Sequence, residues 1–203
     1  MKNILNVINN ADIDPLLIVG ENIDFDLIMR IIDKIRFVSE DILSKAWSKI
    51  LKNELENTSK YTVRTIDLLS RLSHDEAILF HKMSKSVFQT TDGTFYFFND
   101  PHISGNSLLN VNILMEAGFV NSSGISIKNG VFFWDNHYIL TEGETYGLKL
   151  TQFGSDIYQL MDKSWTIMDC KNELDLQKRI LSWSIHKMLD EKHYDPCPIL
   201  VKE

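Results

Sequence analysis

Apolar residues recur at three- and four-residue spacing through the first 90 residues, which predicts a series of amphipathic helices. The first stripe follows Asp24 and consists of Phe25, Ile28, Ile31, Ile32, Ile35 and Val38. A second stripe, after a Ser39 N-cap, consists of Leu43, Trp47, Ile50, Leu51 and Leu55, with Lys45, Lys49, Lys52, Glu54 and Glu56 expected in solvent. Residues 1–23 show no clean period, and Asp12-Ile13-Asp14-Pro15 within them indicates a turn or a helix entry.

Two more helices are predicted before the pattern changes. One is expected over 63–72. Ser73 and Glu76 have the spacing of a capping box, in which each side chain bonds the other residue's backbone N–H. The helix that starts there is expected to carry Ala77, Phe80, Met83, Ser84 and Val87 on one side.

After residue 90 the pattern alternates between short β-rich runs and helices. An aromatic strand is predicted over 94–98 and a helix over 107–117, with Gly118 as its C-cap. Asn129-Gly130 predicts a hairpin between a strand around 125–127 and one over 131–134.

The last third of the chain is predicted to begin with a second strand pair, 137–140 with 146–150. Thr151 is expected to cap a helix that ends near Met161. A final helix is expected over about 172–189, before a proline-containing tail that cannot continue it.

These elements predict an α+β fold. A helical N-terminal region, 1–61, packs on a winged-helix-like domain, 62–163, and an additional C-terminal helix and tail follow over 164–203. The alternative for the middle region is an unspecified α+β domain with the same elements.

Several segments, in a fixed order, are similar to an uncharacterised bacterial family, domain of unknown function 2806. The segments are 46–54 (AWSKILKNE), 61–66 (YTVRTI), 72–80 (LSHDEAILF), 114–120 (LMEAGFV) and the Leu150-Thr151-x-x-Gly154 step. The family's Ala-Gly step is replaced here by Lys52-Asn53. The resemblance spans roughly 38–161 and implies an architecture, while transferring no catalytic residue. The chain also resembles, more faintly, helical proteins of abortive infection, which implies a setting in phage defence.

Composition limits the classes of function. The 203 residues are 44% hydrophobic and carry 21 Lys and Arg against 28 Asp and Glu, a net charge of −7. This balance disfavours a protein that coats nucleic acid, because such binding relies on basic residues that neutralise phosphates. The two cysteines and the lack of a signal-peptide pattern or a long apolar run predict a cytoplasmic protein with no membrane segment.

The residue patterns predict no catalytic site, no metal site and no cofactor. Asp135 and His137 have the elements of a general-base pair, but Asp135-Asn136 is interpreted as a turn between strands. His186, His193 and Cys197 lack a recognisable catalytic partner. The lysines at 45, 49 and 52 share one helix face and form either a solvated surface or a modest anion-facing stripe.

The function predicted from these observations is a non-enzymatic interaction or regulatory module that binds a protein partner or a second copy. Large aromatic side chains anchor many interfaces, and the candidate partner contacts are Phe132, Trp134, Tyr138, Trp165 and Trp183. The alternative is a sequence-specific DNA-binding regulator, with candidate contacts Asn106, Asn110, Asn112 and Lys128. Residues 89–163 disfavour it, because they hold three lysines, no arginine and eight acidic residues.

Overall fold

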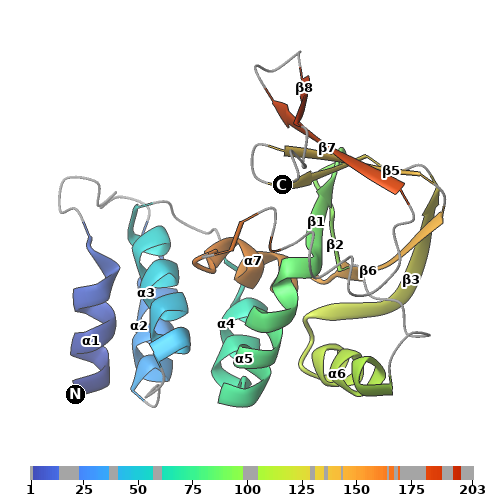
Figure 1. The fold of residues 1–203 in the computed structure, drawn as a ribbon. Helices are drawn as coiled ribbons and strands as arrows, with labels where there is room; N and C mark the ends of the chain where they lie inside the picture. The colour runs from blue at the N-terminus through green and yellow to red at the C-terminus, as the bar shows by residue number, and fades with distance from the viewer. Residues whose placement is uncertain are drawn as a thin grey trace. The chain divides into compact units, whose positions relative to one another are not determined.

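Contacts within the chain divide it into two compact units, residues 1–80 with 152–162, and residues 81–151 with 163–203. The structure is a computed structural model, and it describes residues 2–13, 23–36, 41–56, 61–97, 105–128, 131–134, 137–142, 144–163, 165–166, 169, 182–188 and 194–197. In this part of the chain the first unit is helical, and the second contains all the strands (Figure 1).

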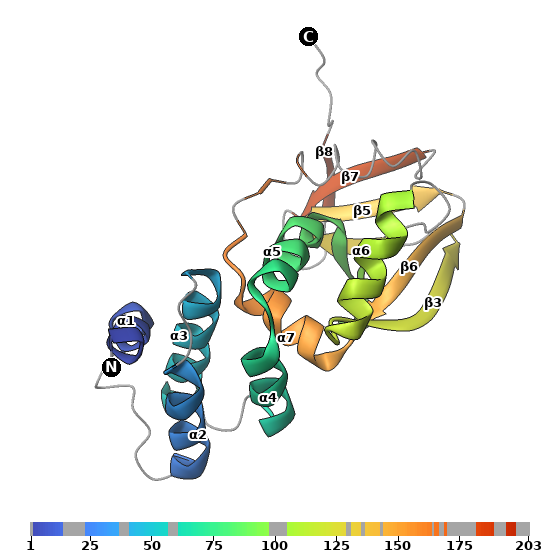
Figure 2. The same ribbon diagram turned by 90° about the horizontal axis from the view of Figure 1, so that it is seen from below.

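The helices of the first unit are α1 (Lys2–Ala11), α2 (Phe25–Ile35), α3 (Asp41–Glu56), α4 (Val63–Arg71), most of α5 (His74–Met83) and α7 (Gln152–Leu160). Helices α1 and α2 both contact α3, and the three lie side by side in both ribbon views (Figures 1 and 2). Helix α7 joins this unit from far along the sequence by contacting α3 and α4.

Local capping explains where three of these helices begin. The Asp24 side chain accepts from the backbone N–H of Leu27 at 3.0 Å, and Thr62 caps α4 in the same way. The predicted capping box is confirmed, because the Ser73 N–H donates to Glu76 and the Glu76 N–H donates to the Ser73 hydroxyl. Such caps satisfy backbone groups that have no partner inside the helix.

Most residues of the predicted stripes of α2 and α3 are in the core of this unit, whereas Ile32 and Leu55 are half-buried and Val38 and the predicted cap Ser39 lie outside the described residues. The fully buried large side chains of the first unit include Trp47, Ile31, Ile35, Ile50, Ile66 and Leu69. Phe25, expected inside, is 68% exposed, whereas Glu54, expected in solvent, is 2% exposed. The sequence did not predict α1. Of its described residues, Val7 and Ala11 are buried, and these two, one turn apart, are too few to form a recognisable apolar stripe.

The second unit is built on one antiparallel sheet. Its strands are β1 (Val87–Thr90), β2 (Phe95–Phe97), β3 (Val120–Lys128), β4 (Val131–Trp134), β5 (His137–Glu142), β6 (Glu144–Leu150), β7 (Ser182–Met188) and β8 (Tyr194–Cys197). The described strands follow the order β3-β6-β2-β1-β4-β5-β7-β8. Phe88 and Phe97 of the central strands and Phe119 before β3 are buried.

Helix α6 (Gly105–Glu116) lies in this unit and contacts β3. Its predicted end at Gly118 is confirmed: Gly118 has φ +83°, and the Phe119 N–H bonds the Leu114 carbonyl at 2.9 Å. A left-handed residue at this position favours glycine, because a Cβ would be strained there.

The strand partners differ from those predicted. The Asn129-Gly130 hairpin is wrong, because β3 pairs with β6 at one edge of the sheet while β4 pairs with β1 and β5. The predicted pair 137–140 with 146–150 is wrong for the same reason, since β5 pairs with β4 and β7. Val87, assigned to the helix after Ser73, instead begins β1, because α5 ends at Met83 and a short 3₁₀ turn follows.

The predicted C-terminal helix is also wrong where the structure describes it. Residues Ser182–Met188 form β7, which pairs with β5 and β8, while 172–181 and 189 lie outside the described residues. Pro196 pairs with His186 in β8, the last strand of the order. Proline is tolerated there because an edge strand leaves some N–H groups unpaired in any case.

The α+β class is confirmed by this mixture of helices and antiparallel sheet. The winged-helix-like assignment and the ranges 1–61, 62–163 and 164–203 stay predictions.

Candidate interaction surface

Two lysines of α3 bind backbone carbonyls at the ends of other helices in the first unit. Lys49 donates to the Leu160 carbonyl at 2.8 Å, at the end of α7, and also pairs with Asp162. Lys52 donates to the Asp12 carbonyl at 2.8 Å, just after α1, and lies 3.8 Å from Glu56. A cation at a helix C-terminus is favourable because the last carbonyls carry partial negative charge. The side chains of Lys49 and Lys52 are still 39% and 36% exposed, so this face is in contact with solvent while its ammonium groups also bind these carbonyls.

A shallow pocket of about 240 Å³ lies beside these lysines. Its lining consists of Lys49, Lys52, Asn53, Tyr61, Gln159 and Leu160. The Asn53 amide donates to the Tyr61 hydroxyl at 3.0 Å, and the Tyr61 N–H donates to Glu54 at 2.8 Å. Lys49, Lys52, Asn53 and Tyr61 of the lining are therefore already bonded within the helical unit.

Tyr61 is expected to make the protein less stable at high pH. Burial raises the pKa of Tyr61 to about 12, from 10.0, and the charges of Asp156 and Glu54 act in the same direction. The folded state therefore holds this proton more tightly than the unfolded state between about pH 10 and 12. The stabilisation is complete below about pH 10 and is lost as the pH rises through about 12.

The Tyr61→Phe variant provides the measurement. Phenolate absorbance titrated in the folded wild type and in Tyr61→Phe should differ by one group with its midpoint near pH 12. The wild type should also lose stability relative to Tyr61→Phe above about pH 10. A difference titration centred at the ordinary tyrosine pKa of 10.0 would contradict the burial argument.

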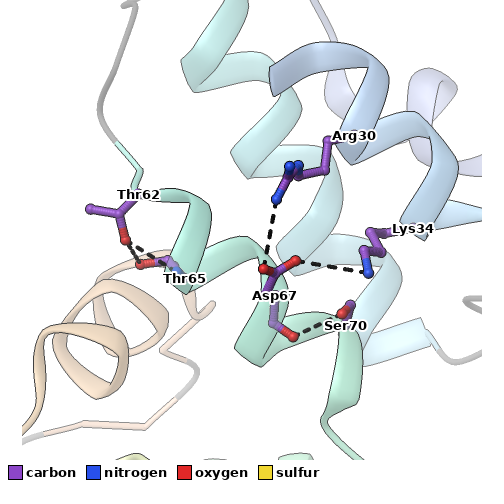
Figure 3. A network of polar contacts seen from close by, with 6 residues as sticks. All are labelled: Arg30, Lys34, Thr62, Thr65, Asp67 and Ser70. Carbon is purple, nitrogen blue, oxygen red and sulfur yellow. Dashed lines mark hydrogen bonds and ion pairs between the residues drawn. The ribbon is translucent and has the colours of Figure 1, made fainter. Parts of the chain in front are cut away.

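Helices α2 and α4 are joined by ion pairs at the surface. Arg30 and Lys34 of α2 both approach Asp67 of α4, at 3.7 and 3.8 Å (Figure 3). All three side chains are more than a third exposed, so solvent screens the attraction. The pairs orient α2 against α4, and they place a positive charge beside the exposed face of α2.

That exposed face carries two large apolar side chains. Phe25 and Met29 are one helical turn apart on α2 and are 68% and 62% exposed. Helix α1 adds Leu5 and Ile8, at 54% and 41% exposure, to the apolar surface of the same unit. We call Phe25 and Met29 the α2 stripe. Neighbouring exposed apolar side chains are typical of surfaces that bind another protein.

The predicted partner contacts lie elsewhere and do not form one cluster. By strand register, Phe132 and Trp134 of β4 and Trp183 of β7 belong to one face of the sheet, and Tyr138 of β5 belongs to the other. Trp165, also a candidate partner contact, is only 6% exposed, with its ring against that of His81 at a centroid distance of 5.4 Å. As partner contacts, the four strand residues stay predictions.

The candidate DNA contacts fall on α6 and β3. Asn106, Asn110 and Asn112 belong to α6, where Asn112 is exposed and Asn110 is half-buried, and Lys128 ends β3. Their role in binding DNA stays a prediction.

Trp134 pairs with His137, and Asp135 and Asn136, interpreted as a turn, lie outside the described residues. His193 also lies outside them; His186 and Cys197 lie in β7 and β8. Among the described residues, no three His, Cys, Asp or Glu side chains gather in a way that could hold a metal ion. No helix in this part of the chain is long and apolar enough to cross a membrane.

Sequence signals could not have located the α2 stripe. Phe25 and Met29 have the apolar character of core residues, and Phe25 fits the buried spacing. Only the three-dimensional packing separates them from Leu27, Ile28 and Ile31, which are buried on the opposite side of the helix.

Comparison with known proteins identifies one family. The family model described as "Protein of unknown function (DUF2806)" matches residues 2–129, more than half of the chain. The match includes four of the five segments that carry the resemblance, whereas 150–154 lies beyond it. No curated protein and no solved structure matches the chain.

Proposed function

The chain belongs to the DUF2806 family, whose function is unknown, and within it we propose that this member is a non-enzymatic bacterial interaction or regulatory module. Its task in this proposal is to bind a protein partner, and no cofactor is required. The setting in phage defence rests on the fainter resemblance alone. A cytoplasmic location is part of the same proposal.

The observation that carries the proposal is the exposure of the α2 stripe. Phe25 and Met29 are exposed to solvent on a helix whose other side is buried. Covering them by another protein removes apolar area from water, which favours binding. The nearby charges of Arg30 and Asp26 supply a polar rim, as binding surfaces usually have.

Affinity capture from the native host tests this function. The tagged wild type and a Phe25→Ser/Met29→Ser variant are each incubated with lysate, with and without nuclease, and the eluates are analysed for protein and nucleic acid. We expect a discrete protein that survives nuclease and is lost with the variant. The control is Val63→Ser/Ile78→Ser, which removes exposed apolar side chains from α4 and α5 and should retain the partner.

The alternative of a DNA-binding regulator predicts a different eluate. Nucleic acid alone, lost on nuclease treatment, would overturn the proposal and favour the candidate contacts on α6. Binding to DNA would then weaken steeply with salt. The acidity of residues 89–163 is the reason to prefer a protein partner.

A further inference from the structure

The exposed side of α2 carries a charge pattern as well as the apolar stripe. Asp26 and Arg30 are both exposed and, like Phe25 and Met29, are four residues apart. Four residues make about one helical turn, so the two charges form a row alongside the two apolar residues. Arg30 is 3.7 Å from Asp67 through one guanidinium nitrogen, and its side chain is 48% exposed.

This pattern is complementary to itself in one arrangement. When two identical helices pack antiparallel about a two-fold axis, each flank of one helix meets the same flank of the other. With the axis level with residue 27, Phe25 lies against Met29 of the second copy and Asp26 lies close to Arg30 of the second copy. Both contacts occur twice by symmetry. In a parallel pair each flank would meet the other flank of the second copy, so Asp26 and Arg30 would not face each other.

We propose that the partner at the α2 stripe is a second copy of this chain, bound through an antiparallel α2–α2 contact. The proposal rests on the proposed function, because it names the occupant of the same surface. The contact between the Met29 sulfur and the Phe25 ring is favourable as well as apolar. The surface is small, so the association is expected to be weak and to depend on protein concentration.

The test uses charges introduced at the two apolar positions of the full chain. Sedimentation of the wild type up to about 500 µM should show a monomer–dimer equilibrium, a range suited to weak interfaces. Phe25→Glu and Met29→Lys should each weaken dimerisation at least about tenfold, because each buries an unpaired charge. Mixing the two single variants should restore a heterodimer, in which the carboxylate introduced at position 25 of one copy faces the ammonium introduced at position 29 of the other.

The chain offers matched controls. Val63 is the first residue of α4, as Phe25 is of α2, and Ile78 is the fifth residue of α5, as Met29 is of α2. Both are exposed, at 46% and 41%. Val63→Glu and Ile78→Lys therefore introduce the same charges at equivalent helix positions and should leave dimerisation unchanged. Circular dichroism of all four variants should match the wild type.

These measurements separate the second copy, the antiparallel register and the proposed function. A wild type that stays monomeric at the highest concentration, or single variants that still dimerise, would overturn the second copy as occupant. Loss of the dimer in both single variants without recovery on mixing would overturn the antiparallel register. If the wild type is monomeric but captures a host protein through the α2 stripe, this inference fails while the proposed function stands. If it dimerises but captures only nucleic acid, the function fails and the dimer stands.

Discussion

Replacing Trp47 by alanine is expected to lower the free energy of unfolding by about 3–5 kcal/mol, the usual range for removing a buried tryptophan. Trp47 is completely buried in the middle of α3, the helix that α1, α2 and α7 all contact. Truncation therefore leaves a cavity where several helices meet. Equilibrium urea unfolding, followed by circular dichroism, provides the measurement.

Trp47→Phe is the matched control for the cavity argument. The Trp47 indole N–H is buried and has no hydrogen-bond partner among the described residues. A buried donor without a partner costs free energy, so removing it offsets part of the packing that phenylalanine loses. We expect Trp47→Phe to stay within about 1.5 kcal/mol of the wild type, as conservative core exchanges usually do. Equal losses in the two variants would show that the cavity is not the cause.

The helices were predictable because their signals are local. The stripe of α3 and the Ser73 capping box involve residues three or four apart, and both are confirmed. The stripe pattern did not separate Phe25 from the buried residues of α2. That residue is exposed because no described element of its unit covers it.

The strand partners were not predictable, because pairing joins distant segments. Asn129-Gly130 favours a local hairpin, yet β3 pairs with β6, and β4 pairs with β1 from much earlier in the chain. The β7 strand did carry a local signal. Trp183 and Ile185 alternate with Ser182, Ser184 and His186, which is a period of two. Leu181 and Leu189, on either side of this run, also fit a helical spacing, and this spacing led to the prediction of a helix.

The contacts of the α3 lysines were not predictable either, because they also join distant segments. Lys49 and Lys52 have the spacing of a solvated or anion-facing stripe, but the carbonyls they bind belong to residues 111 and 40 positions away. Their role as caps depends on where α7 and α1 end in space. The acidic balance of residues 89–163 remains the sequence observation that favours a protein partner over nucleic acid.

Glu54 shows most clearly how a long-range contact changes the role of a residue. Its position in α3 suggested a solvated charge, but the carboxylate is buried and accepts the Tyr61 N–H at 2.8 Å. This bond fixes the chain where it enters α4. The same carboxylate also contributes to the raised pKa of Tyr61.

Glu54→Ala is therefore expected to lower the free energy of unfolding by about 2 kcal/mol, because the buried Tyr61 N–H is left without its acceptor. Glu54→Gln keeps an acceptor oxygen at the same place and should lose less than about 1 kcal/mol, the net value of an ordinary hydrogen bond. Urea unfolding measures both losses. Because Glu54→Gln removes the charge, it should also lower the pKa of Tyr61 in the absorbance titration. A Glu54→Ala variant as stable as the wild type would show that the bond to Tyr61 does not stabilise the entry of the chain into α4.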